Sequence, residues 1–255
     1  MLARVLSGSV VGIEPLPLAV EVDVHPGENK VNIVGLPDAA VKESKDRVSS
    51  AIVNSGFRFP RGWVVVNLAP ADVRKEGSAL DLPIALGLLA ASDQLSGTRF
   101  SEYSCAGELA LDGSIRPISG ALSLALGARQ EKLRGILVPA SNATEAGVVQ
   151  GVDVIPVSTL HEAAGFISGR NEIKPHRTDV RSIFETSRRD MPDLSDVKGQ
   201  AHVKRAMTVA AAGGHNLLMI GPPGTGKTML AARLPGILPD MTFEEALETT
   251  RIFSV

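Results

Sequence analysis

The sequence has little of several features that mark particular classes of protein. Among its 255 residues is one cysteine, Cys105, which excludes an internal disulfide framework and is typical of a reducing compartment. We interpret this lone thiol as a small core residue rather than a nucleophile. The longest apolar stretch, residues 82–91, is shorter than the roughly 20 residues that span a bilayer. Glycine and proline also interrupt the N-terminal apolar residues, so no signal core forms, and we expect a cytoplasmic protein that does not enter a membrane.

The sequence also lacks an excess of charge of one sign. Its net charge is −2, so the global basic signature of a nucleic-acid-binding protein is absent. A local basic patch remains compatible with this total. The apolar fraction of 44% is ordinary for a globular protein, and the length allows two sizeable cores.

Three zones follow one another along the chain. Residues 1–167 alternate short apolar runs with glycine and proline, and we expect one domain there. Residues 168–192 are polar, charged and aperiodic, and predict a linker. We interpret it as a solvated tether, with a dedicated DNA-contacting segment as the alternative. Residues 193–255 begin a second unit.

The first zone mixes strand and helix patterns. Strands are expected at residues 19–24, 30–34, 63–68, 135–138 and 152–157, and helices at 38–55, 81–91, 120–132, 142–149 and 159–165. Asp38 is a plausible N-cap, and Asp112 with Gly113 predicts the turn of a hairpin. This mixture predicts an α+β domain.

Residues 221–228 carry the strongest motif in the chain. They are Gly221, Pro222, Pro223, Gly224, Thr225, Gly226, Lys227 and Thr228, and they fit the P-loop pattern G-x-x-x-x-G-K-[ST] in full. The apolar run 216–220 before the loop predicts a buried strand. Residues 229–234 after it, and residues 200–212 upstream, predict helices.

The chemistry of this motif requires these residue types at these places. Glycines allow successive N–H groups to point inward at phosphate oxygens. Lys227 supplies a positive charge to the β- and γ-phosphates as the catalytic residue, and Thr228 offers its hydroxyl to Mg²⁺. Met229 completes the set of nucleotide-binding residues in the loop. The sequence therefore predicts a site for ATP and Mg²⁺.

Two further stretches resemble a known family. Residues 196–200 (DVKGQ) and 211–218 (AAGGHNLL), with the P-loop, are similar to the AAA+ module of magnesium-chelatase-like ATPases. Residues 32–44 (NIVGLPDAAVKES) are similar to the N-terminal domain of the YifB/ComM family. The resemblance implies that Val197, Gly199 and Gln200 lie against the adenine.

The N-terminal domain of that family resembles the proteolytic domain of Lon, which has a ribosomal-protein-S5-like fold. Lon proteases use a serine activated by a lysine. The matching positions here carry Ala79 and Leu122, and Ser78 is one residue away, a rotation of about 100° on a helix. The resemblance thus implies a non-proteolytic platform for packing and oligomerisation. The expected fold is an S5/Lon-protease-like α+β domain followed by an incomplete α/β P-loop NTPase domain of the AAA+ type.

The resemblance also implies a function for a full-length protein. ComM-type members resemble hexameric helicases that drive branch migration of DNA in recombination and transformation, so a homo-hexamer and branched or single-stranded DNA are the expected partners. One alternative is a metal-chelatase-type ATPase subunit that acts on a porphyrin. Another is a nucleotide-binding interaction module without turnover. The Lon-like first zone favours the helicase, because chelatase motor subunits resemble only the second part.

A P-loop ATPase also needs an acidic Walker B residue at the end of an apolar strand. Only 27 residues follow Thr228, and the nearest imitation, residues 236–240, contains a proline. Residues 242–250 predict a helix with an exposed acidic face instead. No sensor residue or arginine finger can be assigned. We therefore expect the N-terminal part of a protein about twice as long, judging by the family, which binds ATP but turns it over negligibly.

Overall fold

The computed structural model describes residues 2–75, 77–96, 99–179, 192–239 and 241–254. The chain divides into two compact units, Met1–Thr178 with Thr250–Val255, and Asp179–Thr249. The first unit thus continues to Thr178, beyond the boundary expected at residue 167. Residues 180–191 of the predicted linker lie outside the described residues.

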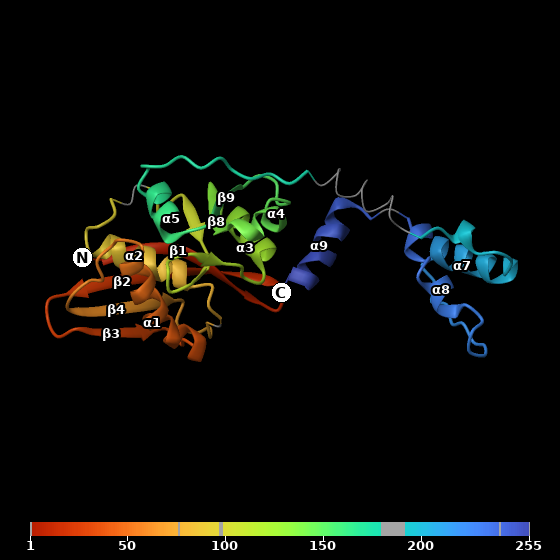
Figure 1. Ribbon diagram of the computed structural model, residues 1–255, viewed down its shortest axis with the longest axis horizontal. Helices are drawn as coiled ribbons and strands as arrows, with labels where there is room; N and C mark the ends of the chain where they lie inside the picture. Colours follow the sequence, from red (N-terminus) through yellow and green to blue (C-terminus); the bar gives the residue numbers. More distant parts are fainter. Residues whose placement is uncertain (1, 76, 97–98, 180–191, 240, 255) are drawn as a thin grey trace. The chain divides into compact units, whose positions relative to one another are not determined.

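A seven-stranded sheet forms the centre of the first unit (Figure 1), in the order β3-β4-β2-β1-β5-β8-β9. The β1–β2 and β2–β4 pairs are antiparallel, and the other pairs are parallel. A separate hairpin joins β6 to β7, with the turn at the predicted place. The strands are β1 (Leu2–Val11), β2 (Glu14–His25), β3 (Lys30–Val34), β4 (Trp63–Ala69), β5 (Tyr103–Cys105), β6 (Glu108–Leu109), β7 (Ile115–Arg116), β8 (Gly135–Pro139) and β9 (Asp153–Val157). The unit is therefore mixed α/β with a mostly parallel sheet, and β1 is a strand that the sequence did not predict.

The helices of this unit begin where side chains cap them. Asp38 accepts a hydrogen bond from the Val41 N–H at 2.7 Å, which confirms the predicted N-cap. Thr159 accepts one from the Glu162 N–H at 3.2 Å at the start of another helix. The helices are α1 (Ala39–Asn54), α2 (Asp81–Ala91), α3 (Ala121–Gln130), α4 (Ala143–Ala146) and α5 (Leu160–Ile167), with a 3₁₀ turn, η1 (Ala140–Asn142), before α4.

The core lies on both faces of the central strands. Helix α2 is buried along its whole length and packs against β1 and β2, with α1 beside it. On β4 the alternate residues Val64, Val66 and Leu68 are fully buried. Helix α3 also packs against β2, so the consecutive residues 18–20 of that strand are all buried. Cys105 belongs to this core, and burial raises the pKa of its thiol, which confirms its interpretation as a packing residue.

The first residues of the predicted linker pack on the first unit. The His176 N–H donates to the Val154 carbonyl at 2.8 Å, and the Thr178 N–H donates to the Gly147 carbonyl at 3.1 Å. The Thr178 hydroxyl also donates to the Thr144 carbonyl at 2.6 Å. Residues 169–178 are therefore attached at their end to β9 and α4, although no periodicity in the sequence signals this.

A buried ion pair joins three elements of the first unit. Asp81, at the first position of α2, is fully buried and accepts hydrogen bonds from Arg47 Nε at 2.8 Å and Nη2 at 3.1 Å. The Leu109 N–H of β6 donates to the same carboxylate at 3.2 Å. Burial raises the pKa of Asp81, while the hydrogen bond from Arg47 lowers it. The bidentate contact from α1 thus offsets part of the desolvation of this carboxylate, whose pKa stays above its ordinary value.

The second unit is helical in its described part. Its elements are η2 (Leu194–Asp196), α7 (Ala201–Gly213), α8 (Lys227–Ala231) and η3 (Pro235–Ile237), followed by the start of α9 (Phe243–Ser254). Thr242 and Glu245 form reciprocal hydrogen bonds at the start of α9, and its acidic side chains are exposed as predicted. In none of the described helices do length and apolarity suffice for crossing a membrane.

The strand predicted at residues 216–220 is not present. These residues have no regular structure, and Leu218 and Ile220 are 82% and 88% exposed. A strand forms only when a neighbouring strand pairs with its N–H and C=O groups, and the described residues of this unit contain no other strand. The prediction was wrong because an apolar run specifies a strand only when a partner is present.

We expect Arg47→Ala to destabilise the first unit by about 3–5 kcal/mol, because it leaves the buried Asp81 carboxylate without its cation. Urea unfolding followed by the fluorescence of Trp63, the one tryptophan of the chain, measures this change. The control is Arg134→Ala, which breaks a pair with Glu102 whose side chains are 60% and 42% exposed and should shift the midpoint far less. Equal shifts for the two variants would contradict the assignment.

Candidate nucleotide-binding site

The P-loop of the second unit has a defined backbone shape. Gly224 and Gly226 have φ angles of 81° and 80°, in the left-handed region that side chains other than glycine rarely adopt. Gly226 directly precedes α8, so the loop leads into a helix as the motif requires. A Cβ added at Gly224 would meet no neighbour within 4 Å, which leaves the backbone there open to a ligand.

Lys227 lies folded over this loop. Its Nζ donates to the carbonyl oxygens of Gly221 and Pro222, at 2.8 Å each, and approaches Thr225 Oγ1 at 3.3 Å. All of these partners are neutral. A phosphate oxygen in the same place would offer the ammonium a negatively charged acceptor, which a carbonyl oxygen is not. The Lys227 ammonium is therefore positioned over the loop, where a phosphate would bind.

The turn before α7 is joined to the P-loop by Gln200. This residue has a φ angle of 53°, and its Nε2 donates to the Thr225 carbonyl at 2.9 Å. Val197 is buried in a small cluster with Leu194, Met207 and Leu230, the last of which comes from α8. The Lys204 ammonium donates to the Val197 carbonyl. Gly199 is exposed, and a Cβ built there would meet nothing within 4 Å. Two of the three residues expected near the adenine thus contact P-loop elements, and Gly199 does not.

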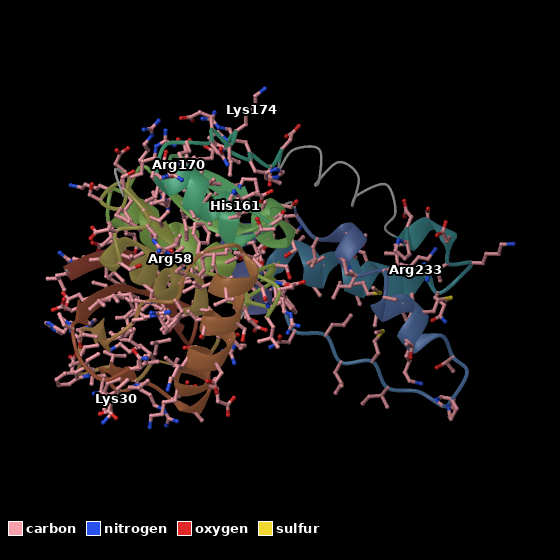
Figure 2. All side chains as sticks on the ribbon, turned by 60° about the vertical axis from the view of Figure 1, so that its left-hand side comes forward. Lys30, Arg58, His161, Arg170, Lys174 and Arg233 are labelled. Atoms are coloured by element: carbon pink, nitrogen blue, oxygen red, sulfur yellow. The ribbon has the colours of Figure 1, made fainter. Side chains whose placement is uncertain are left out.

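Arg233 is a second connection that the sequence analysis missed (Figure 2). Its Nε donates to the Asp193 carbonyl at 3.0 Å, its Nη1 donates to the Met229 carbonyl at 3.0 Å, and its Nη2 lies 3.8 Å from an Asp196 oxygen. It therefore ties the chain just after α8 to residues 193–196. The signal in the sequence was weak, because a single arginine after a P-loop is common on exposed helix surfaces.

The remaining predicted site residues lie around the loop. Pro223 and Thr225 are exposed, and Thr228 and Met229 are exposed in the first turn of α8. Within the described ranges, no group of three or more histidine, cysteine, aspartate or glutamate side chains could hold a metal ion. A divalent cation at this site would therefore depend on the Thr228 hydroxyl and on the phosphates of a bound nucleotide.

The first unit contains a cavity of about 360 Å³ where the Lon-like dyad would be expected. Ser78 and Ala79 line it, and the Ser78 hydroxyl donates to Glu108, which also pairs with Arg116 at 3.3 Å. Leu122 is fully buried in α3. No lysine is among the described residues that line the cavity.

The nearby Lys75 is buried elsewhere. Its Nζ donates to the carbonyl oxygens of Pro70 and Val73, at 2.7 Å for Val73, and burial lowers its pKa. The lysine that a serine–lysine dyad needs is thus lacking beside Ser78. Glu108, which the sequence analysis did not single out, is the charged side chain that contacts this serine.

Comparison with known proteins assigns both units to related families. Residues 20–142 match the family described as subunit ChlI of Mg-chelatase, and residues 193–255 match magnesium chelatase, subunit ChlI. The chain is 46% identical over 255 residues to the uncharacterized protein YifB of Escherichia coli, covering 100% of this chain and 49% of the relative. It is 43% identical over 256 residues to competence protein ComM of Haemophilus influenzae, covering 100% of this chain and 50% of the relative.

A more distant similarity is confined to part of the chain. The archaeal Lon protease of Pyrococcus abyssi is 33% identical over 84 residues, which are 32% of this chain and 8% of that protein. The chain spans about half the length of YifB and ComM. With matches to ChlI models in both units and full coverage by these two relatives, the chain belongs to the magnesium-chelatase-like family that includes YifB and ComM.

Proposed function

We propose that the second unit binds ATP with Mg²⁺ through residues 221–228. The observation that carries the proposal is Lys227, whose ammonium lies over a glycine-shaped loop with only neutral oxygens as partners. Its transfer from those carbonyls to the β- and γ-phosphates replaces neutral acceptor oxygens with negatively charged ones. The loop N–H groups would receive the phosphate oxygens, and Thr228 would hold Mg²⁺, which would supply positive charge against the phosphates.

The adenine end of the proposed site is formed by residues 197–200. The bond from Gln200 to the Thr225 carbonyl and the contacts of Arg233 hold this turn against the P-loop. The base and the phosphates would therefore be bound by parts that move together. This arrangement favours a nucleotide over free phosphate, because both ends of the ligand contribute to one connected site.

For a longer protein that contains this chain, we propose an AAA+ ATPase that assembles as a homo-hexamer and moves branched DNA in the cytoplasm. The support is the resemblance to ComM-type members and the similarity over the whole chain to a competence protein. The proposed domains are an S5/Lon-protease-like domain at residues 1–167, a linker at 168–192 whose first part packs on that domain, and the beginning of the AAA+ module at 193–255. The chain itself would turn ATP over negligibly, because no described residue after Thr228 follows a strand as a Walker B carboxylate does. Asp240, the nearest imitation, lies outside the described residues.

A metal-chelatase-type ATPase subunit is the second candidate. The family model that matches residues 20–142 bears the chelatase name as well, so the first zone does not separate the two functions as the sequence analysis expected. A strand-exchange assay with a protein that continues beyond residue 255 distinguishes them. Movement of a DNA junction supports the first proposal, and ATP turnover that depends on a porphyrin without any DNA effect supports the second. Nucleotide binding with neither activity would favour an interaction module.

We expect Lys227→Ala to weaken ATP binding about 10- to 150-fold, because charge-assisted hydrogen bonds to the phosphates are lost. Isothermal titration calorimetry of the chain with ATP and Mg²⁺ measures this change. Arg205→Ala is the matched control, since it removes an exposed cation of the same unit outside the proposed site and should leave the affinity unchanged. An unchanged affinity of Lys227→Ala would remove the basis of the proposed site.

We expect no peptidase activity from the cavity of the first unit. The Ser78 hydroxyl donates a hydrogen bond to the Glu108 carboxylate, which also pairs with Arg116. Ala79 and Leu122 cannot act as nucleophile or base. Unfolded casein and fluorogenic peptides should remain intact when incubated with the chain. Cleavage that Ser78→Ala abolishes would show that the nucleophile had been placed one residue away from its true position.

A further inference from the structure

We propose that residues 57–63 of the first unit, together with the side chains beside them, form a surface that binds single-stranded nucleic acid. This segment connects the end of α1 to β4 and alternates rings with cations, in the order Phe57, Arg58, Phe59, Pro60, Arg61, Gly62 and Trp63. We call it, with Lys30, His25 and His161, the ring–cation surface. The proposal rests on the DNA motor proposed above for its biological setting, but its test requires neither ATP nor the P-loop.

Aromatic rings lie at both ends of this surface. Trp63, the first residue of β4, is 49% exposed, and its ring centroid lies 6.5 Å from that of His25. At the other end Phe57 stacks on His161 of α5, with centroids 5.8 Å apart and planes inclined by 29°. Phe57 and Phe59 also pack against the core, so packing alone accounts for aromatic residues at these two positions. The core does not explain Trp63, whose neighbours on β4 alternate between buried and half-buried while it stays exposed.

Arg58 and Arg61 lie between the rings in the sequence. His25, in contrast to these cations, is 3.0 Å from an Asp23 oxygen. Arg58, Arg61 and Lys30 are exposed, and none of them forms an ion pair with another described residue. Lys30 lies opposite Trp63 in the register of the β3–β4 pair. In the view of Figure 2, Arg58 lies between His161 and Lys30 in projection. The surface therefore combines unpaired positive charge with exposed aromatic area.

The backbone beneath these side chains is held in place. The Arg58 N–H donates to Gln94 Oε1 at 2.8 Å, and Gln94 Nε2 donates back to the Arg58 carbonyl at 2.6 Å. The Gly62 N–H donates to Asn29 Oδ1 at 2.7 Å, and the Lys30 N–H donates to the Gly62 carbonyl at 3.2 Å. Fixed attachment at both ends means that little backbone ordering is required on binding.

This combination selects one class of partner. Proteins that bind single strands pair a cationic track for the phosphates with rings on which unpaired bases stack. A duplex keeps its bases stacked inside and offers no faces to Trp63. An acidic protein would satisfy Arg58 and Arg61 but would leave the exposed ring without a specific partner. Seven residues reach at most about 25 Å, which is long enough to follow several nucleotides.

The chain provides its own probe for this proposal, because Trp63 is its one tryptophan. We expect a 20-nucleotide polythymidine strand to quench the Trp63 fluorescence, and inorganic polyphosphate, which has no bases, to leave it largely unchanged. Anisotropy of the labelled strand measures the affinity. Trp63→Thr, which keeps a strand-forming residue, should weaken binding about five- to 150-fold, the range for loss of one base stack.

The cations are tested by salt dependence. The double variant Arg58→Ala/Arg61→Ala should reduce the slope of log affinity against log salt by about 1.4, the value for two lost phosphate contacts on a single strand. Lys42→Ala/Lys45→Ala, which removes two exposed lysines from the first half of α1, is the matched control and should leave both slope and affinity unchanged. Circular dichroism confirms that each variant is folded.

Several outcomes would overturn the proposal. They are strand binding without quenching of Trp63, equal losses in the two double variants, and polyphosphate quenching as strong as that of the strand. Lys227→Ala should keep its affinity for the strand. For the unsubstituted chain, strand binding without ATP binding would contradict the nucleotide site alone, and ATP binding without strand binding would contradict the ring–cation surface alone.

Discussion

The buried ion pair of Arg47 and Asp81 is the interaction on which the first unit most depends. It fixes the start of α2 against α1 and, through the Leu109 N–H, against β6. Residues 57–63 follow α1 after Ser55 and Gly56, so the contact also holds the helix from which that segment continues. Strand β6 also carries Glu108, so the ion pair helps to position the carboxylate that accepts a hydrogen bond from Ser78. Removing Arg47 would leave the Asp81 carboxylate buried without its cation, whereas the Arg47 side chain, 23% exposed, would still contact water without Asp81.

The two units divide the chemistry between them. The second unit places one flexible cation, Lys227, over a loop whose shape depends on left-handed backbone at Gly224 and Gly226. The first unit has a cavity that Ser78 lines, and no described lysine lines it. The serine–lysine dyad of Lon proteases is therefore incomplete there. Phosphate binding is thus supported by the geometry of one unit, whereas peptide cleavage is not supported by that of the other.

Most helices and several strands could be predicted from the sequence, because their signals are local. Asp38 caps α1, and the apolar run of α2 marks a helix buried on all sides. Features that depend on distant residues could not be predicted. Strand β1 lacks clear alternation and is defined by pairing with β2, and residues 216–220 stay irregular because no described strand pairs with them. In the site, the P-loop residues follow from the motif, but the contacts of Arg233 depend on a turn some 40 residues earlier.

The claim that the P-loop backbone receives phosphate is tested most directly by amide hydrogen exchange of the chain, followed by mass spectrometry. The loop residues 221–225 are exposed in the structure, so their amides should exchange rapidly in the free chain. Addition of ATP with Mg²⁺ should slow exchange at residues 224–228 and at the turn around Gln200, while adenosine, which lacks phosphates, should leave the loop amides fast. Equal exchange with and without ATP, or equal protection by adenosine, would contradict the account.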